Sequence, residues 1–70
     1  MTAEERARYI DQRVRLARIS RALDDDPEDD EILREWQHTS KEVEALQKRF
    51  TKDIAGDPTI ESEISRRSQK

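Results

Sequence analysis

The residues of this chain that could do chemistry are an acidic run, one histidine and several serines. The acidic run reads DDDPEDDE over residues 24–31 and holds seven carboxylates and no base. Counted from Asp24, oxygen ligands fall where an EF-hand calcium loop has them, and Glu35 is the twelfth residue. The sixth residue is Asp29, whereas the sharp turn of such a loop requires glycine. We therefore predict no metal site, and interpret the acids as groups that favour the start of a helix.

The remaining candidates do not form a catalytic set. His38 is the only histidine and the chain has no cysteine, so no zinc cage and no cysteine nucleophile can be built. No plausible base stands at helical spacing from the serines: Ser40, Ser62, Ser65 and Ser68. No glycine-rich loop is present to bind phosphate. We expect no enzyme activity, no cofactor and no small-molecule substrate.

The composition describes one small and highly charged unit. Of its 70 residues, 44% are charged and 31% are apolar, and no apolar run exceeds two residues. Such a pattern contains neither a membrane span nor the apolar centre of a secretory signal, so we expect a cytoplasmic protein without membrane contact. The 14 basic and 17 acidic residues give a net charge of −3, which provides no overall attraction to nucleic acid.

Local signals indicate where two long helices begin. Thr2 followed three residues later by Glu5 forms a capping box, which predicts a helix over about 3–23. Asp26 can act as the N-cap of the next helix, with Pro27 as its first residue, because the missing N–H of proline is no loss there.

The second helix is predicted over about 27–55, and Gly56 stands where a left-handed C-terminal cap belongs. Residues 1–56 then form an antiparallel two-helix hairpin, and residues 57–70 form a short polar helix or a flexible tail. No stretch alternates apolar and polar residues as a strand would. The predicted fold is all-α.

The second helix has one apolar stripe, whereas the first helix has two apolar faces. The stripe alternates spacings of four and three residues, which is typical of coiled-coil packing, with Thr39 as one polar position. We assign the bulkier face of the first helix to the hairpin seam, because Leu23 lies beside the turn. The predicted seam residues are Tyr9, Leu16, Ile19, Leu23, Ile32, Trp36, Val43 and Leu46.

The second face of the first helix has no partner within a two-helix hairpin. We expect a second copy or a partner helix to complete a four-helix bundle there, although the alanines could also be simple helix formers. The longer second helix also overhangs, and either the tail, with Ile60 and Ile64, or another chain must cover its end. The predicted interaction residues are Ala3, Ala7, Ile10, Val14, Ala17, Phe50 and Ile54.

Two resemblances bear on function. In residues 22–37 a polar turn with proline precedes a run similar to the pattern Leu-Leu-x-acid-aromatic-Gln. The residues that match are Ala22, Leu23, Asp25, Pro27, Ile32, Leu33, Glu35, Trp36 and Gln37. This segment resembles the helix-turn-helix of type III secretion needle subunits, which implies a component of secretion assembly. The C-terminal TIESEISRRSQK departs from the apolar helix of those subunits. In length, acidic loop and hairpin plan the chain is also similar to the RNA-binding Rop family of plasmid regulators, but no motif supports transferring its binding residues.

Our hypothesis is a non-catalytic protein–protein interaction or assembly module that acts through the apolar faces of the hairpin, by self-association or by binding a helical partner. One alternative is a small acidic inhibitor or adaptor, of phage or plasmid type, that uses residues 24–31. Two more are a needle-assembly component and a Rop-like RNA-binding hairpin, although the arginines of the first helix scatter around its axis. Salt separates these hypotheses, because an apolar contact persists at high ionic strength whereas charge contacts weaken.

Overall fold

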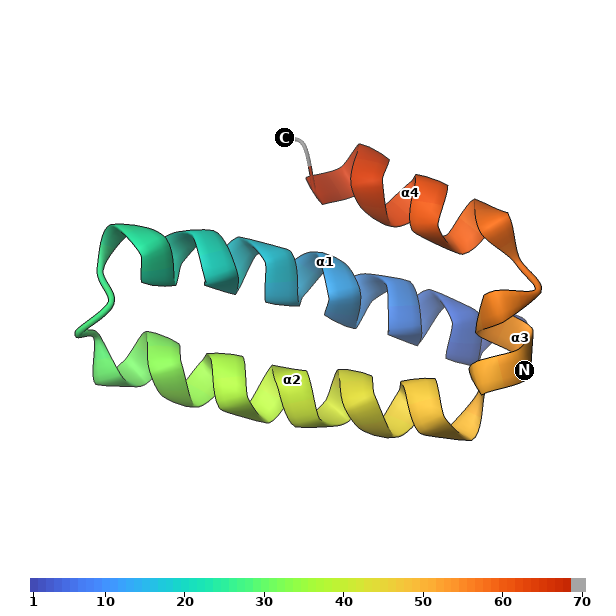
Figure 1. Cartoon of the computed structure of the whole chain (residues 1–70), viewed down its shortest axis with the longest axis horizontal. Helices are drawn as coiled ribbons and strands as arrows, with labels where there is room; N and C mark the ends of the chain where they lie inside the picture. Colours follow the sequence, from blue (N-terminus) through green and yellow to red (C-terminus); the bar gives the residue numbers. More distant parts are fainter. Residues whose placement is uncertain (69–70) are drawn as a thin grey trace.

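The computed structural model describes residues 1–68, which fold into four helices. Helices α1 (Ala3–Asp25) and α2 (Asp30–Arg49) form an antiparallel hairpin, which confirms the predicted all-α hairpin. The short α3 (Thr51–Ala55) turns the chain, and α4 (Pro58–Ser68) returns along α1 (Figure 1). Helix α1 therefore lies in the middle, with α2 packed on one side and α4 on the other.

The capping box predicted at the start of α1 is present. The backbone N–H of Glu5 donates to the hydroxyl of Thr2 at 3.2 Å, and the N–H of Thr2 donates to the Glu5 carboxylate at 3.0 Å. At the other end, α1 continues to Asp25, two residues past the predicted end. There the N–H of Asp26 donates to the carbonyl of Ala22 at 2.9 Å, so Asp26 closes α1.

The predicted start of the second helix is wrong by three residues. Asp29 is the N-cap of α2, and its carboxylate accepts from the N–H groups of Glu31 at 3.0 Å and Ile32 at 3.2 Å. Because Asp26 is used at the end of α1, Pro27 stands in the turn between the helices and not in the first turn of α2. A carboxylate that reaches two free amides is the stronger start signal.

The single helix predicted over 27–55 is interrupted at Phe50, whose φ of −117° and ψ of 32° are not helical. The hydroxyl of Thr51 donates to the carbonyl of Gln47 at 2.6 Å, and such bonds to the preceding turn bend helices. The predicted left-handed cap is also wrong, because Gly56 has a right-handed conformation with φ of −84°.

The hydrophobic core lies on both sides of α1. Tyr9 of α1 and Val43 of α2 occupy the hairpin seam, where Thr39 is also buried. Helix α4 adds Ile60 and Ile64, which stand one turn apart and are 0% and 5% exposed. The buried cluster comprises Tyr9, Ile10, Val14, Val43, Ile60 and Ile64, with Leu16, Leu46 and Ile54 packed against it.

The other predicted seam residues also face the interior. Ile19 is 7% exposed, and the half-buried members are Leu16, Leu23, Ile32, Trp36 and Leu46. Of the segment predicted over 57–70, residues 58–68 form a helix, and residues 69 and 70 lie outside the described residues. The tail thus supplies cover that the two-helix hairpin lacks.

We predict that Ile64→Ala destabilises the fold by about 2–5 kcal/mol, since a buried isoleucine loses its transfer free energy and leaves a cavity. That loss is comparable to the whole stability expected of so small a domain. Urea unfolding followed by circular dichroism measures it. The matched control is Ser65→Ala, an exposed position on the same helix. Equal stability of the two variants would contradict a role for α4 in the core.

Candidate functional site

The predicted interaction face of α1 is covered within the same chain. Ile10 is 1% exposed and Val14 is 7% exposed, because Ile60 and Ile64 of α4 pack into their cluster. The expectation that these two residues need a second chain is therefore wrong. The other predicted interaction residues are not gathered into one face: Ala3 and Ala7 are exposed, and Ala17, Phe50 and Ile54 are half-buried.

Two arginines of α1 attach α4 on either side of this apolar contact. Arg6 donates to the carboxylates of Asp57 at 3.3 Å and Glu63 at 3.4 Å. Arg13 donates to both carboxylate oxygens of Glu61, at 2.9 Å and 3.3 Å. Sequence reasoning treated these arginines only as part of a scattered basic set. The available signal was that each stands within one turn of an apolar residue on the face that α4 covers.

Tyr9 is the fully buried polar group that joins the elements. Its hydroxyl accepts hydrogen bonds from Arg13 at 2.8 Å and from Gln47 of α2 at 3.3 Å. The Arg13 guanidinium also lies 5.7 Å from the centre of the Tyr9 ring. Every buried side-chain nitrogen and oxygen of the described residues has a hydrogen-bond partner. Within residues 1–68 the hydrogen bonds of the interior are thus made by the protein itself.

Carboxylates along the helix contacts are held in their ionised form by similar bonds. Glu42 of α2 accepts from Arg8 at 2.9 Å and from Gln12 at 2.7 Å. The hydrogen bond from Arg8 is the main cause that lowers the pKa of Glu42 below its usual value. The pKa of Asp57 is likewise lowered, chiefly by the hydrogen bond from the Thr59 hydroxyl. These ionised carboxylates stabilise the contacts between the helices.

Where α4 ends, the surface of α1 changes from a face that α4 covers to an open groove lined by arginines. Helix α4 has 11 residues and α1 has 23, so α4 covers only the first part of α1 (Figure 1). At this point lies a groove of about 570 Å³, which we call the arginine groove. It is lined by Asp11, Val14, Arg15, Arg18, Arg66 and Arg67.

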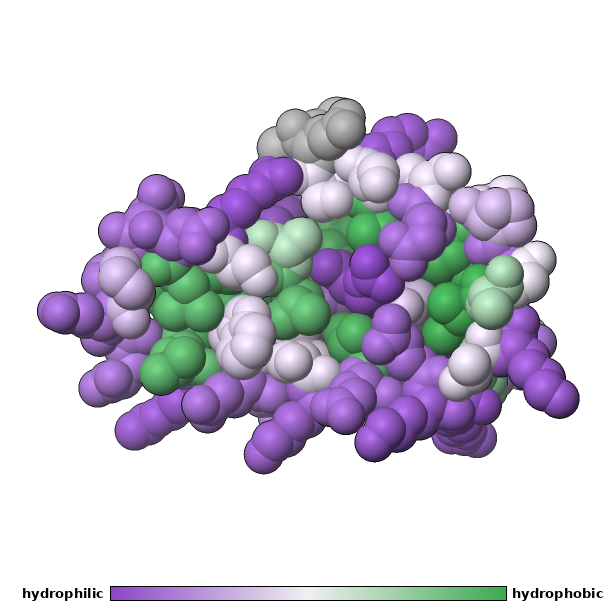
Figure 2. Space-filling model, viewed as in Figure 1, coloured by the Kyte–Doolittle hydropathy of each residue, from purple (hydrophilic) through white to green (hydrophobic). Residues whose placement is uncertain are grey.

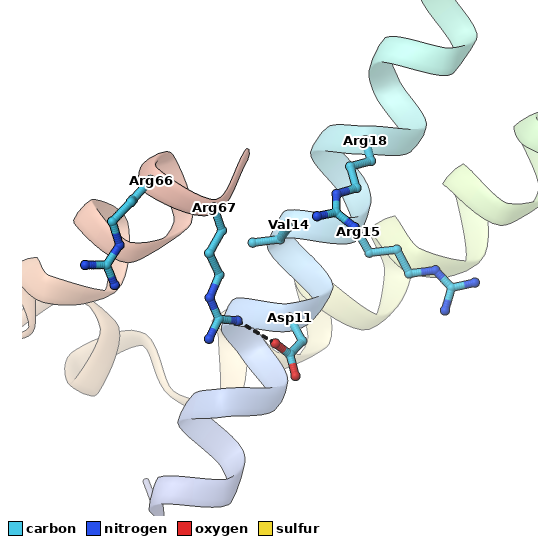
Figure 3. A pocket seen from close by; sticks show the side chains of 6 residues that line it. All are labelled: Asp11, Val14, Arg15, Arg18, Arg66 and Arg67. Atoms are coloured by element: carbon cyan, nitrogen blue, oxygen red, sulfur yellow. Dashed lines mark hydrogen bonds and ion pairs between the residues drawn. The ribbon is translucent and has the colours of Figure 1, made fainter. Parts of the chain in front are cut away.

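Most of the positive charge in the arginine groove is free. Arg67 pairs with Asp11 at 2.8 Å, and also with Glu63. Within residues 1–68 the other three arginines of the groove form no ion pair: Arg15, Arg18 and Arg66. Figure 3 shows Arg18 and Arg67 on either side of Val14, whereas Arg15 points away from α4.

The opposite charge lies at the adjacent end of the hairpin. Residues 24–31, which we call the acidic tip, cover the end of α1, the turn and the start of α2. Asp29 serves as the cap of α2. In the described part of the chain, none of the seven carboxylates of the acidic tip forms an ion pair. This concentration of negative charge is therefore available to a partner.

Apolar side chains reach the surface beside the acidic tip. Leu33 is 39% exposed, and Leu23 and Ile32 are half-buried because no third helix within residues 1–68 covers this end of the seam. Figure 2 shows apolar surface over the loop end of α1 and α2, with hydrophilic residues around it. Trp36 lies one turn further along α2, where its ring N–H donates to the Ser20 hydroxyl at 3.2 Å.

Neither a metal-binding cluster nor a membrane-spanning helix is found in residues 1–68. No group of three or more metal-ligating side chains is close enough to hold an ion there. None of the described helices combines the length and the hydrophobicity that crossing a membrane requires. A shallower groove of about 420 Å³ at the far end of the hairpin is lined in part by Ile54, Gln47 and Thr51.

Comparisons of this chain with protein-family models, with curated proteins and with solved structures found no match. Its function is therefore inferred from its own residues. The loop end of the hairpin, with its acidic tip, its apolar residues and the adjoining arginine groove, is the candidate site.

We predict that acid destabilises the fold partly through Glu42. A carboxyl whose pKa is lowered by folding adds stability above its usual pKa of 4.5, and this stability is lost as the pH falls through the lower folded-state value. Glu42→Gln should therefore lose less thermal stability than the parent chain between about pH 6 and pH 3. The control is Glu44→Gln, which alters only an exposed pair with Lys48. Parallel pH profiles of parent and Glu42→Gln would contradict the assignment.

Proposed function

We propose that this chain is a non-catalytic protein-contact module that binds its partner through the loop end of the hairpin. The observation that carries the proposal is the acidic tip beside apolar side chains that the chain itself leaves partly uncovered. Apolar surface surrounded by charge is the arrangement found at protein interfaces. Leu33, whose exposed fraction is 39%, supports the proposal because it offers apolar surface next to the free carboxylates.

The proposed partner has a surface that is apolar at its centre and basic at its rim. Leu23, Ile32 and Leu33 supply a small apolar area, which by itself contributes only a few kcal/mol. The seven carboxylates of the acidic tip speed the encounter with a positive surface and select its orientation. This proposal combines protein contact with the acidic-adaptor hypothesis, because the cover that α4 provides for Ile10 and Val14 weakens the case for an interface on their face of α1.

RNA binding and needle assembly receive less support than protein contact. RNA binding has one favourable observation, the gathering of Arg18, Arg66 and Arg67 at the arginine groove. The acidic tip lies at the same end of the molecule, however, and its charge opposes phosphate. A role in needle assembly is compatible with the proposal, since the resemblance lies in residues 22–37, which form the loop end.

A basic amphipathic helical peptide with one leucine stripe and one arginine stripe is the probe for this proposal. Trp36, the only tryptophan, reports binding at the loop end by its fluorescence. Removing three tip charges with Asp24→Asn, Asp25→Asn and Glu28→Gln should weaken peptide binding about tenfold. Leu33→Ser should weaken it by a similar factor, about tenfold, by removing an apolar contact.

The matched control removes three charges at the far end, with Glu4→Gln, Glu44→Gln and Asp53→Asn. This variant has the same net charge as the tip variant and should bind the peptide as the parent chain does. A scrambled peptide of the same composition should bind more weakly. Equal binding of both peptides, or equal loss in both charge variants, would contradict a specific contact at the loop end.

A further inference from the structure

The arginines in the first half of α1 form ion pairs with the other helices, whereas those in its second half form none within residues 1–68. Arg6 and Arg13 hold α4, and Arg8 holds α2 through Glu42. Beyond the end of α4, the described residues provide no ion pair for Arg15, Arg18 or Arg21. The acidic tip follows immediately and is also unpaired. Free positive and free negative charge therefore stand in sequence along one uncovered part of the same helix.

These unpaired charges lie on the face of α1 that α4 would cover if α4 were longer. In helical geometry Arg21 lies within about 20° of the direction of Val14, and Asp25 also lies within about 20° of it. Arg18 and Asp25 are seven residues apart and hence share this face. The face that begins with Ile10 and Val14 under α4 thus continues as a basic and then an acidic surface.

We propose that two copies of this chain pair through this face of α1 in an antiparallel, two-fold arrangement. The inference rests on the proposed function, because it names a second copy as the partner of the acidic tip. With the axis between residues 21 and 22, Arg18 of each copy lies opposite Asp25 of the other. The acidic tip of each copy then lies toward the arginine groove of the other, and the contact is closed and self-complementary.

Charge complementarity favours a second copy as the occupant of this face, and it favours an antiparallel orientation of the two α1 helices. A parallel pairing of two α1 helices would place Arg18 opposite Arg18 and one acidic tip beside the other, which is repulsive. The antiparallel pairing places unlike charges opposite each other twice, at Arg18 and Asp25, against one like-charge contact between the two Arg21 side chains beside the axis. Ala17 and Ala22 lie at the two borders of this face, where their small side chains leave room for close approach of the two helices. Because α4 ends before this face, it does not occupy the position of the second copy.

The test is a set of charge reversals measured by sedimentation velocity over a dilution series from about 1 mM to about 1 µM. Arg18→Glu and Asp25→Arg should each weaken dimerisation at least about tenfold, because each creates two like-charge contacts per dimer. Mixing the two single variants should restore dimerisation, since both contacts then join unlike charges. The double variant R18E/D25R should also dimerise. Raising the salt concentration from about 50 mM to about 500 mM should weaken the parent dimer.

The matched controls are Lys41→Glu and Glu35→Lys, which change the net charge by the same amounts at exposed positions on α2. They should dimerise as the parent chain does. Arg18 and Asp25 are both exposed, and circular dichroism should show that every variant is folded. A parent chain that stays monomeric, or single variants whose mixture dimerises no better than either alone, would overturn the pairing.

These outcomes are separable from those of the proposed function. A monomer that still binds the basic peptide through the acidic tip overturns the pairing and leaves the protein-contact function in place. A dimer that strengthens with salt and ignores Arg18→Glu also overturns the pairing, because it indicates an apolar contact elsewhere.

Discussion

The packing of α4 on α1 is the contact on which the rest of this structure depends. Ile60 and Ile64 close an apolar surface that the hairpin of α1 and α2 leaves open, and Ile10 and Val14 become buried as a result. Each such isoleucine contributes about 1.5–3 kcal/mol when fully buried. In a chain of 70 residues, few other residues are available to form a core. The arginine contacts of α4 and the position of the free surface both follow from where this helix begins and ends.

The length of α4 divides the molecule into a structural half and an open half. Where α4 covers α1, arginines and carboxylates pair across the helices, and Tyr9 is fully enclosed. Where α4 is absent, the charged residues of α1 have no partners in the described chain and the seam is covered on one side only. An open half with segregated charges is suited to recognition, because its free charges can steer and orient a partner.

This division changes which part of the molecule we associate with function. An apolar face that needs a partner would have made association obligatory for folding. The chain instead buries that face by itself, and the candidate contact surface consists of charges with a few apolar residues. Association through such a surface is sensitive to salt and can be reversible without unfolding either partner. The proposed partners, a basic apolar surface or a second copy, both present positive charge to the acidic tip.

Much of the fold could be predicted from local sequence. The capping box of Thr2 and Glu5, the hairpin and the seam residues follow from spacing and capping, which depend on neighbours along the chain. The helix break at Phe50 and the cap at Asp29 were missed because several adjacent residues offer competing caps and bends. The roles of Arg6 and Arg13 were missed for a different reason: their acidic partners lie more than 40 residues away in sequence.

Sequence alone thus determined that the chain is helical, where its first helix starts, and that one face of that helix needs cover. Only the tertiary structure decided what covers it. Ile60 and Ile64 could equally have packed on the overhanging end of the second helix, and the choice depends on the direction in which the chain leaves α3. That direction results from the break at Phe50 and the turn at Gly56 acting together with the burial of α4. Because α4 packs on the first part of α1, Arg18 and the acidic tip remain exposed. No periodicity in the sequence specifies this exposure.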